Sequence, residues 1–303
     1  MCTLASTLPS ENQLVVDLLA TLRSEKFSLR AWIRFLGRSW EMSCRTAHDN
    51  PTLKRSWMRV LLFISLLAIA LLLACAVFEG LPVALHLLPG LLFCVVWQQS
   101  DLFWHLGLNR WSQLGGTGKL FPVIGTANIC TQLRGLGACF LFGRLIGGVT
   151  TPTGVALLIF LGGIVTDILD GQIARRTCTQ SKLGQITDSE ADFCLYLALT
   201  IILMQHGVLP LWLGMVMLLR FLIPFFVALA SYFLFAHPVR FGSTIWGKYA
   251  GLAQSLYFFV LLVPTQFTFL ARWLHLPLLV VTLALLIVAP VAQIVVNLKA
   301  LRA

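Results

Sequence analysis

The chain has 303 residues, of which 58% are hydrophobic and 11% are charged, and its mean hydropathy is +0.86. This apolar content exceeds what the core of a soluble domain of this length requires, so it excludes an ordinary soluble protein and predicts a polytopic membrane protein. The net charge of +10 would indicate nucleic acid only if the basic residues formed a soluble face. They fall mostly between apolar stretches, which favours anionic lipid as their partner and no nucleic acid.

Residues 1–58 are expected to form a cytoplasmic or interfacial segment before the first apolar stretch. Ser10 and Gln13 have the spacing of a capping box for a first helix. A second, amphipathic helix is expected over residues 28–40, where arginine recurs at every fourth position and large apolar residues supply another face. This pattern favours a helix in the lipid headgroup layer. A cytoplasmic helix packed on the protein is the alternative.

Apolar stretches that approach or exceed the roughly 20 residues needed to cross a bilayer follow along the rest of the chain. We expect eight spans, at residues 60–78, 83–96, 127–145, 153–169, 191–204, 209–235, 252–269 and 276–296. The first two, with a glycine-rich connector, define a region at 59–122, and the last six define a core at 123–303. The expected fold class is all-α: a polytopic membrane helix bundle with a six-helix core preceded by two extra transmembrane helices.

Lysine and arginine are concentrated in the N-terminal segment and in alternate loops, with Arg144 and Arg272 as exceptions. Because cytoplasmic loops collect these residues, both termini are expected to be cytoplasmic, at the inner membrane if the source is bacterial. The first apolar run begins only near Val60 and acidic residues precede it, so we expect a membrane anchor and no cleavable signal.

From Leu102 onward, all acidic residues lie in one short segment that ends at Asp192. Its first part places Asp167, Asp170, Gly171 and Ala174 at i, i+3, i+4 and i+7, which puts them on one helix face. Carboxylates are ligands for hard divalent cations, and glycine leaves bare backbone for the close approach of a ligand. An arginine follows at once and suits phosphate binding. The pattern predicts a site for a metal-bridged nucleotide pyrophosphate.

The next helix is expected to repeat this arrangement, since Gly184, Asp188 and Asp192 stand at i, i+4 and i+8. Glu190 falls outside the pattern. Four carboxylates that converge in a poorly solvated site repel one another by several kcal/mol, and bound metal ions would remove that conflict. The alternative, in which these aspartates only cap helices or pair with nearby arginine and lysine, does not explain the glycine and alanine spacing.

The whole pattern, D-x-x-D-G-x-x-A-R-x(8)-G-x-x-x-D-x-x-x-D, resembles the signature of the CDP-alcohol phosphotransferases (CDP-alcohol phosphatidyltransferases), integral membrane enzymes of phospholipid synthesis. Asn128, Thr131 and Arg134 are similar to the N-x-x-T-x-x-R element of the first core helix in these enzymes. Lys248 lies in a segment similar to the G-K-x-K-T-x-x-Q of the phosphatidylglycerophosphate synthase branch, but this chain lacks the second lysine and the threonine. The resemblance covers about residues 123–303.

The resemblance implies two Mg²⁺ or Mn²⁺ ions held by four carboxylates, those of Asp167, Asp170, Asp188 and Asp192. Asp192 is also the implied general base for the acceptor hydroxyl. The residues implied to contact the nucleotide are Asn128, Thr131, Gly171, Ala174, Arg175 and Gly184. The resemblance further implies a homodimer and a CDP-linked donor, and we expect CDP-diacylglycerol with release of CMP.

Three cations near the cytoplasmic side, Arg134, Arg220 and Lys248, are candidates to hold a phosphate of the acceptor alcohol. Each is equally explained as a snorkelling side chain at a span boundary. The acceptor alcohol therefore stays open between phosphorylated and uncharged or zwitterionic alcohols.

Three other functions compete with this interpretation. A phosphotransferase that transfers from CDP-choline or CDP-ethanolamine to diacylglycerol uses the same chemistry. A transporter also uses carboxylates in the membrane, but it predicts ionisable groups at the midplane and internal symmetry, and no repeat is visible. A non-catalytic relative is the third alternative, and the presence of all four aspartates argues against it.

Overall fold

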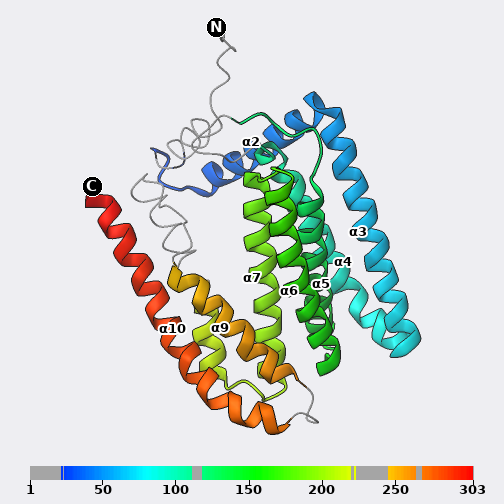
Figure 1. Cartoon of the computed structure of the whole chain (residues 1–303). Helices are drawn as coiled ribbons and strands as arrows, with labels where there is room; N and C mark the ends of the chain where they lie inside the picture. The colour runs from blue at the N-terminus through cyan, green and yellow to red at the C-terminus, as the bar shows by residue number, and fades with distance from the viewer. Residues whose placement is uncertain are drawn as a thin grey trace.

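The computed structural model describes residues 22, 24–110, 118–219, 222, 245–263 and 268–302. Within these residues the protein is helical apart from its connections, which include an isolated bridge between the extended backbone of Arg110 and that of Leu120. The long helices run side by side in a bundle (Figure 1). The long helices among the described residues are α2 (Leu29–Asp49), α3 (Pro51–Phe78), α4 (Leu81–Trp104), α5 (Thr126–Ile146), α6 (Thr153–Arg176), α7 (Lys182–Gln205), α9 (Ile245–Leu262) and α10 (Thr268–Arg302), with a short 3-10 helix, η1 (Leu106–Leu108).

Among the described residues, five helices are long and apolar enough to cross a membrane: α3, α4, α5, α6 and the part of α10 from Trp273 to Ala292. The protein is therefore a multi-pass, all-α membrane bundle, as the sequence predicts. The expected span at 191–204 lies within α7, which carries three acidic residues in its first half. Most of the expected span at 209–235 lies outside the described residues, but residues 211–219 are helical.

The expected span at 252–269 overlaps a helix, but its bounds are wrong. The helix there, α9, ends at Leu262, and α10 begins at Thr268. Val263, which precedes a proline in the sequence, is no longer helical, and the helical conformation is disfavoured for the residue before a proline. Apolar residues flank Thr265 and Gln266 on both sides, which is why the sequence suggests a longer span. Six helical segments are described after residue 123: α5, α6, α7, the segment at 211–219, α9 and α10. The division of the chain into three regions stays a prediction.

Helix α5 is the centre of the bundle, because it packs on α4, α6 and α7. Small residues allow α4 to come close to it. A Cβ atom added at Gly90 would lie 2.9 Å from the Cβ atom of Ile146, and one added at Gly147 would lie only 2.3 Å from the carbonyl oxygen of His86. Such separations are too short for any side chain, so the two backbones are in direct contact. The additional helices are thus packed tightly on the core.

Polar contacts also join α4 to α5. Gln98 donates from Nε2 to the carbonyl oxygen of Gln132 (2.9 Å), and Gln99 donates from Nε2 to the Oε1 atom of the same residue (2.9 Å). Gln132 lies two residues before Arg134. These hydrogen bonds between the two helices fix the position of α5 along α4 in a region where water is scarce.

At the other end of α5, Arg144 is a buried cation with its own counter-ion. Its two terminal nitrogens donate to both carboxylate oxygens of Glu79 (2.8 and 2.7 Å), a residue in the turn between α3 and α4. The side chain of Arg144 is 1% exposed. The hydrogen bond from Arg144 lowers the pKa of Glu79 below its ordinary value. This ion pair explains why an arginine lies at the end of the bundle opposite to most other cations.

Candidate active site

Three helices bring the predicted acidic residues together at one end of the bundle. Asp167 and Asp170 stand near the C-terminal end of α6, and Asp188 and Asp192 stand in the first half of α7. The guanidinium group of Arg134, from α5, lies between the two pairs and donates hydrogen bonds to all four carboxylates. The sequence spacing therefore predicted the convergence of the carboxylates correctly, but it did not predict the cation at their centre.

Arg134 divides its hydrogen bonds between the two helices. Nη1 donates to the Oδ1 atoms of Asp167 (2.8 Å) and Asp192 (2.5 Å). Nη2 donates to Oδ2 of Asp170 (2.8 Å) and to Oδ1 of Asp188. The side chain of Arg134 is only 1% exposed. A buried guanidinium without counter-ions would be strongly unfavourable, so the carboxylates are what allow Arg134 to sit inside the bundle.

The carboxylates differ in their access to solvent. The side chain of Asp170 is 10% exposed, whereas those of Asp167, Asp188 and Asp192 are 53%, 42% and 38% exposed. The site therefore opens to the surface on three of its four acidic groups. Four negative charges and the single positive charge of Arg134 leave a formal charge of −3 when every group is ionised.

The donor set fits divalent cations. Carboxylate oxygens of Asp167, Asp170 and Asp188 lie within 4.8 Å of one another, and such oxygens are the ligands that Mg²⁺ and Mn²⁺ prefer. The excess negative charge calls for further cations, because one guanidinium does not neutralise four carboxylates. Asp167, Asp170, Asp188 and Asp192 are thus the residues that could hold metal ions.

Asn128 and Thr131 lie on the face of α5 that meets α6 and α7, and both are buried. The hydroxyl group of Thr131 donates to Oδ2 of Asp170 (2.9 Å) and so fixes the most buried carboxylate of the site. Asn128 points at Gly184, where an added Cβ atom would lie 2.7 Å from Oδ1 of Asn128. The glycine in the pattern therefore lets α7 approach α5 closely, a packing role that its spacing alone did not reveal.

The nucleotide-contacting residues predicted on α6 lie beside this site. Gly171 and Ala174 are half-buried, and Arg175 is exposed. The Arg175 side chain folds back over Gly171, since an added Cβ atom at Gly171 would lie 3.2 Å from Nη1 of Arg175. Arg175 is therefore an exposed cation on the same helix as Asp167 and Asp170, and it makes no ion pair with an acidic group within the described part of the chain.

The three predicted acceptor cations do not come together among the described residues. Arg134 is engaged by the four carboxylates, Lys248 is exposed on α9, and Arg220 lies outside the residues that the structure describes. Their role in holding an acceptor phosphate stays a prediction.

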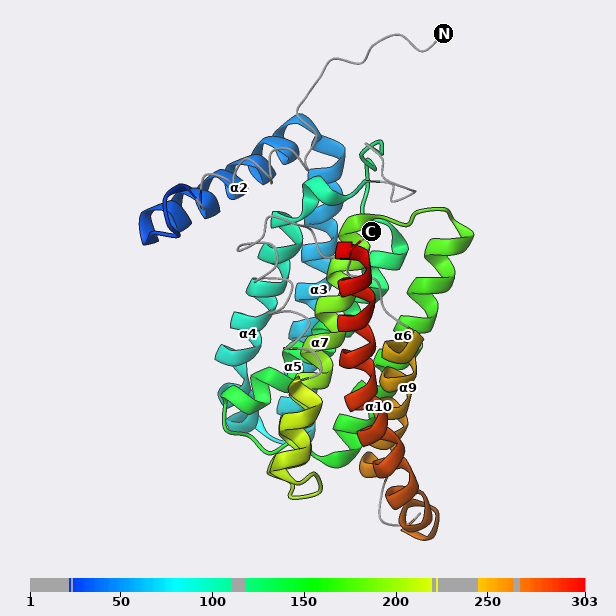
Figure 2. The ribbon, with the colours of Figure 1, turned by 90° about the vertical axis from the view of Figure 1, so that its left-hand side faces the viewer.

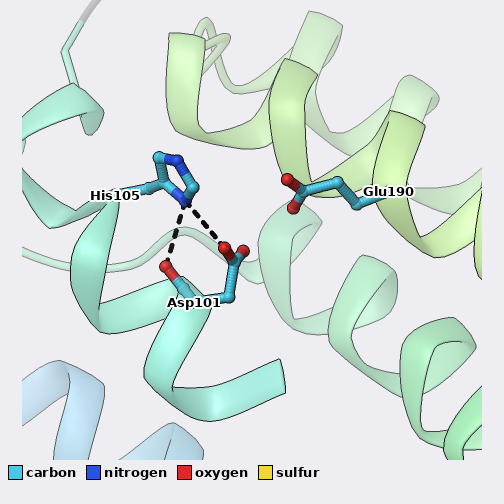
Figure 3. A group of neighbouring side chains, drawn as sticks. All are labelled: Asp101, His105 and Glu190. Carbon is cyan, nitrogen blue, oxygen red and sulfur yellow. Dashed lines mark hydrogen bonds and ion pairs between the residues drawn. The ribbon is translucent and has the colours of Figure 1, made fainter. Parts of the chain in front are cut away.

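A second group of charged residues connects α7 to the additional helices. Asp101 and His105, from the C-terminal end of α4, face Glu190 of α7 (Figure 3), and the three side chains offer polar atoms within 4.8 Å of one another. His105 contacts Asp101 through Nδ1, at 3.3 Å from Oδ1. Burial disfavours a charge on His105, but the hydrogen bond with Asp101 and the nearby Glu190 outweigh it and raise the pKa of His105. The sequence pattern excluded Glu190 and gave no signal for this contact.

These features define an integral membrane protein with a cluster of acidic side chains at one end of its helix bundle. A model of the CDP-alcohol phosphatidyltransferase family matches residues 124–289, more than half of the chain, and includes all four aspartates. The chain belongs to this family of membrane transferases.

Two curated relatives match a short part of the chain. The chain is 46% identical over 68 residues to a probable cardiolipin synthase (CMP-forming) of Drosophila melanogaster, a stretch that covers 22% of the chain and 20% of the relative. It is 42% identical over 67 residues to a cardiolipin synthase (CMP-forming) of Streptomyces coelicolor, which covers 22% of the chain and 31% of the relative. The matches thus span about a fifth and about a third of these relatives. No solved structure matches the chain.

Proposed function

We propose that the protein transfers a phosphatidyl group from a CDP-linked lipid, CDP-diacylglycerol, to an alcohol and releases CMP in phospholipid biosynthesis. The observation that carries this proposal is the convergence of Asp167, Asp170, Asp188 and Asp192 at one end of a membrane bundle. Membership of the CDP-alcohol phosphatidyltransferase family supports the class of reaction. The names of both relatives state that CMP is formed, which supports the leaving group.

The four aspartates would hold two Mg²⁺ or Mn²⁺ ions, which would act as Lewis acids toward the pyrophosphate and neutralise the charge that develops on it. Arg134 must then give up part of its contacts with the carboxylates, and its charge would stay beside the donor phosphates. Arg175 would bind a phosphate from the surface side. Gly171 and Ala174 present little side chain, so the nucleotide would approach the backbone of α6.

Asp192 would accept the proton of the attacking hydroxyl group. The acceptor oxygen forms a bond to the phosphorus of the phosphatidyl group, the bond from that phosphorus to the CMP oxygen breaks, and CMP leaves with the electron pair. Asp192 suits this role because it is partly exposed (38%) and bonded to Arg134 at 2.5 Å, so it meets both the substrate side and the buried cation. Asn128 and Thr131 would position these groups from α5.

The acceptor is tested by supplying one alcohol at a time to purified protein with CDP-diacylglycerol and Mn²⁺ and measuring released CMP. The panel contains phosphatidylglycerol, glycerol 3-phosphate, inositol, inositol phosphate, serine, choline and ethanolamine. Phosphatidylglycerol is included because cardiolipin, the product in the names of the relatives, joins two phosphatidyl groups through a glycerol. One alcohol should drive CMP release, and the Asp192→Asn variant should lose it while Asp49→Asn, an exposed aspartate outside the site, retains it.

If no alcohol in the panel leads to CMP release, CDP-diacylglycerol is not the donor. CMP release from CDP-choline or CDP-ethanolamine with diacylglycerol would then replace the proposal by the other phosphotransferase reaction.

The site and both termini are further proposed to face the cytoplasm, which the distribution of lysine and arginine supports. Cys44 and Cys178 are exposed cysteines on α2 and in the turn between α6 and α7. A membrane-impermeant thiol reagent should modify both only after cells are permeabilised. A cysteine introduced as Leu81→Cys, at the exposed first residue of α4, should react in intact cells. The reverse pattern would invert the orientation. The homodimer that the resemblance implies is tested by the mass of the purified protein–detergent complex, where the mass of one chain would contradict it.

A further inference from the structure

Helix α2 carries large apolar side chains that keep much of their surface exposed in the described structure. Leu29, Ile33, Leu36 and Trp40 are 77%, 62%, 44% and 41% exposed. They stand at i, i+4, i+7 and i+11, so they form one stripe within an arc of about 60°. Lipid-facing leucines of α3 show the same exposure, such as Leu66 at 56%. The stripe thus has the exposure of a surface that meets lipid.

A row of arginines accompanies this stripe. Arg30, Arg34 and Arg38 recur at every fourth residue and are all exposed. The row begins about a quarter turn around the helix from the apolar stripe. Arg34 pairs with Glu25, but within the described part of the chain no acidic group pairs with Arg30 or Arg38. Arg30 and Arg38 are therefore available to anionic groups of a partner.

The position of α2 in the chain indicates which anionic groups lie near its arginines. A single residue, Asn50, separates α2 from α3, which is one of the membrane-spanning helices. Figure 2 shows α2 projecting sideways from the end of the bundle at which α3 begins. The covalent link places the helix at the level of the lipid headgroups, because α3 enters the bilayer within a few turns of its start.

The C-terminal half of α2 is held on the bundle. Ser43 donates from Oγ to the carbonyl oxygen of Trp104 (2.5 Å), and Trp104 donates from Nε1 to Oγ of Ser39 (2.6 Å). The ring of Trp40 lies 5.2 Å from that of Phe103. The first half of the helix extends beyond these contacts, so its apolar stripe and its arginines are available to a partner.

We infer that α2 is an in-plane anchor that binds the surface of a bilayer containing anionic lipid, with its apolar stripe among the acyl chains and Arg30, Arg34 and Arg38 on lipid phosphates. Amphipathic helices of this composition gain affinity for a membrane from the burial of apolar side chains and from the attraction of their cations to anionic lipid. Each arginine near an anionic surface contributes about a fivefold change in binding. This inference does not depend on the proposed catalytic activity.

The test is hydrogen exchange of the amides of residues 29–40 in the full-length protein, reconstituted one copy per lipid nanodisc. Exchange should be at least about fivefold slower, the contribution of one arginine, when phosphatidylglycerol replaces a third of the phosphatidylcholine. Raising the salt to 1 M shortens the Debye length from about 8 Å to about 3 Å and should remove this difference without any mutation.

The triple variant Arg30→Gln, Arg34→Gln, Arg38→Gln should also lose the difference. The matched control replaces three exposed cations at the start of α3, Lys54, Arg55 and Arg59, by glutamine and should keep it. Ile33→Ser with Leu36→Ser should speed exchange in both lipids.

Equal exchange in both lipids for the wild-type protein would overturn the inference. So would protection that appears only in discs loaded with two copies, because the apolar stripe would then bind another chain.

Discussion

Replacement of Arg134 by glutamine should make the folded protein dependent on bound divalent metal. The wild-type guanidinium group is 1% exposed and bonds to four carboxylates. Without it, the four negative charges face one another with no cation between them. Metal ions that bind the same carboxylates would restore the balance, so Arg134→Gln should be unstable in a chelator and recover in Mg²⁺ or Mn²⁺.

The expected loss of stability follows from the burial of the Arg134 guanidinium group. Removing one partner from a buried charge network costs about 3–5 kcal/mol. The lower end applies here, because Asp167, Asp188 and Asp192 are more than a third exposed and water screens their repulsion. At roughly 2–4 °C of Tm for each kcal/mol in a chain of this size, the loss in the chelator corresponds to about 10 °C.

The assay is thermal unfolding in detergent of wild type, Arg134→Gln and Arg175→Gln, each in EDTA and in excess Mn²⁺. Arg175→Gln removes an exposed cation beside the same site and should change Tm little. If Arg134→Gln unfolds in EDTA at the wild-type temperature, the guanidinium group does not neutralise the carboxylates. If its Tm falls but does not respond to Mn²⁺, the carboxylates do not form a metal site.

Three other measurements check the packing and the charged contacts. Gly147→Ala should destabilise the protein by about 1–3 kcal/mol, because the added methyl group would meet the His86 carbonyl at 2.3 Å, whereas Gly162→Ala, with open space around it, should be neutral or stabilising; equal Tm values would show that α4 and α5 are not in close contact. The lowered pKa of Glu79 means that its pairing with Arg144 stabilises the fold at neutral pH and that this stability is lost as the pH falls below the ordinary value of 4.5. Glu79→Gln should therefore lower Tm at pH 7 and flatten the acid side of the profile of Tm against pH, and an unchanged profile would argue against the pair. The raised pKa of His105 means that its charged form adds stability that is present below its ordinary value of 6.5 and is lost as the pH rises through the higher pKa of the folded state. Glu190→Gln should shrink this change in Tm, and a profile identical to that of the wild type would exclude the contact.

The fold class and the convergence of the four aspartates followed from the sequence because both depend on periodicity. Apolar runs of membrane length predict spans, and carboxylates at i, i+3 and i, i+4 predict a shared helix face. Apolar runs do not by themselves give the ends of α9 and α10, since apolar residues flank Thr265 and Gln266 on both sides.

The central position of Arg134 was not predictable in the same way. An arginine in α5 has no local signal that tells whether it points to a substrate or to carboxylates 33 and 58 residues away, and only the packing of α5 between α6 and α7 decides this. The contact of Glu190 with Asp101 and His105 likewise joins residues from helices that are distant in sequence. The spacing of Gly184 was recognised, but its role in admitting Asn128 required three-dimensional contact.

The decisive measurement is Mn²⁺-dependent release of CMP from CDP-diacylglycerol, in the presence of the active acceptor, by wild type and by four single variants. These variants are Asp167→Asn, Asp170→Asn, Asp188→Asn and Asp192→Asn. Each should insert into membranes and unfold cooperatively, yet lose nearly all CMP release, because each removes one oxygen ligand from a shared cation site. Wild-type release from any of the four would remove that residue from the site, and wild-type release from all four would contradict the proposed active site altogether.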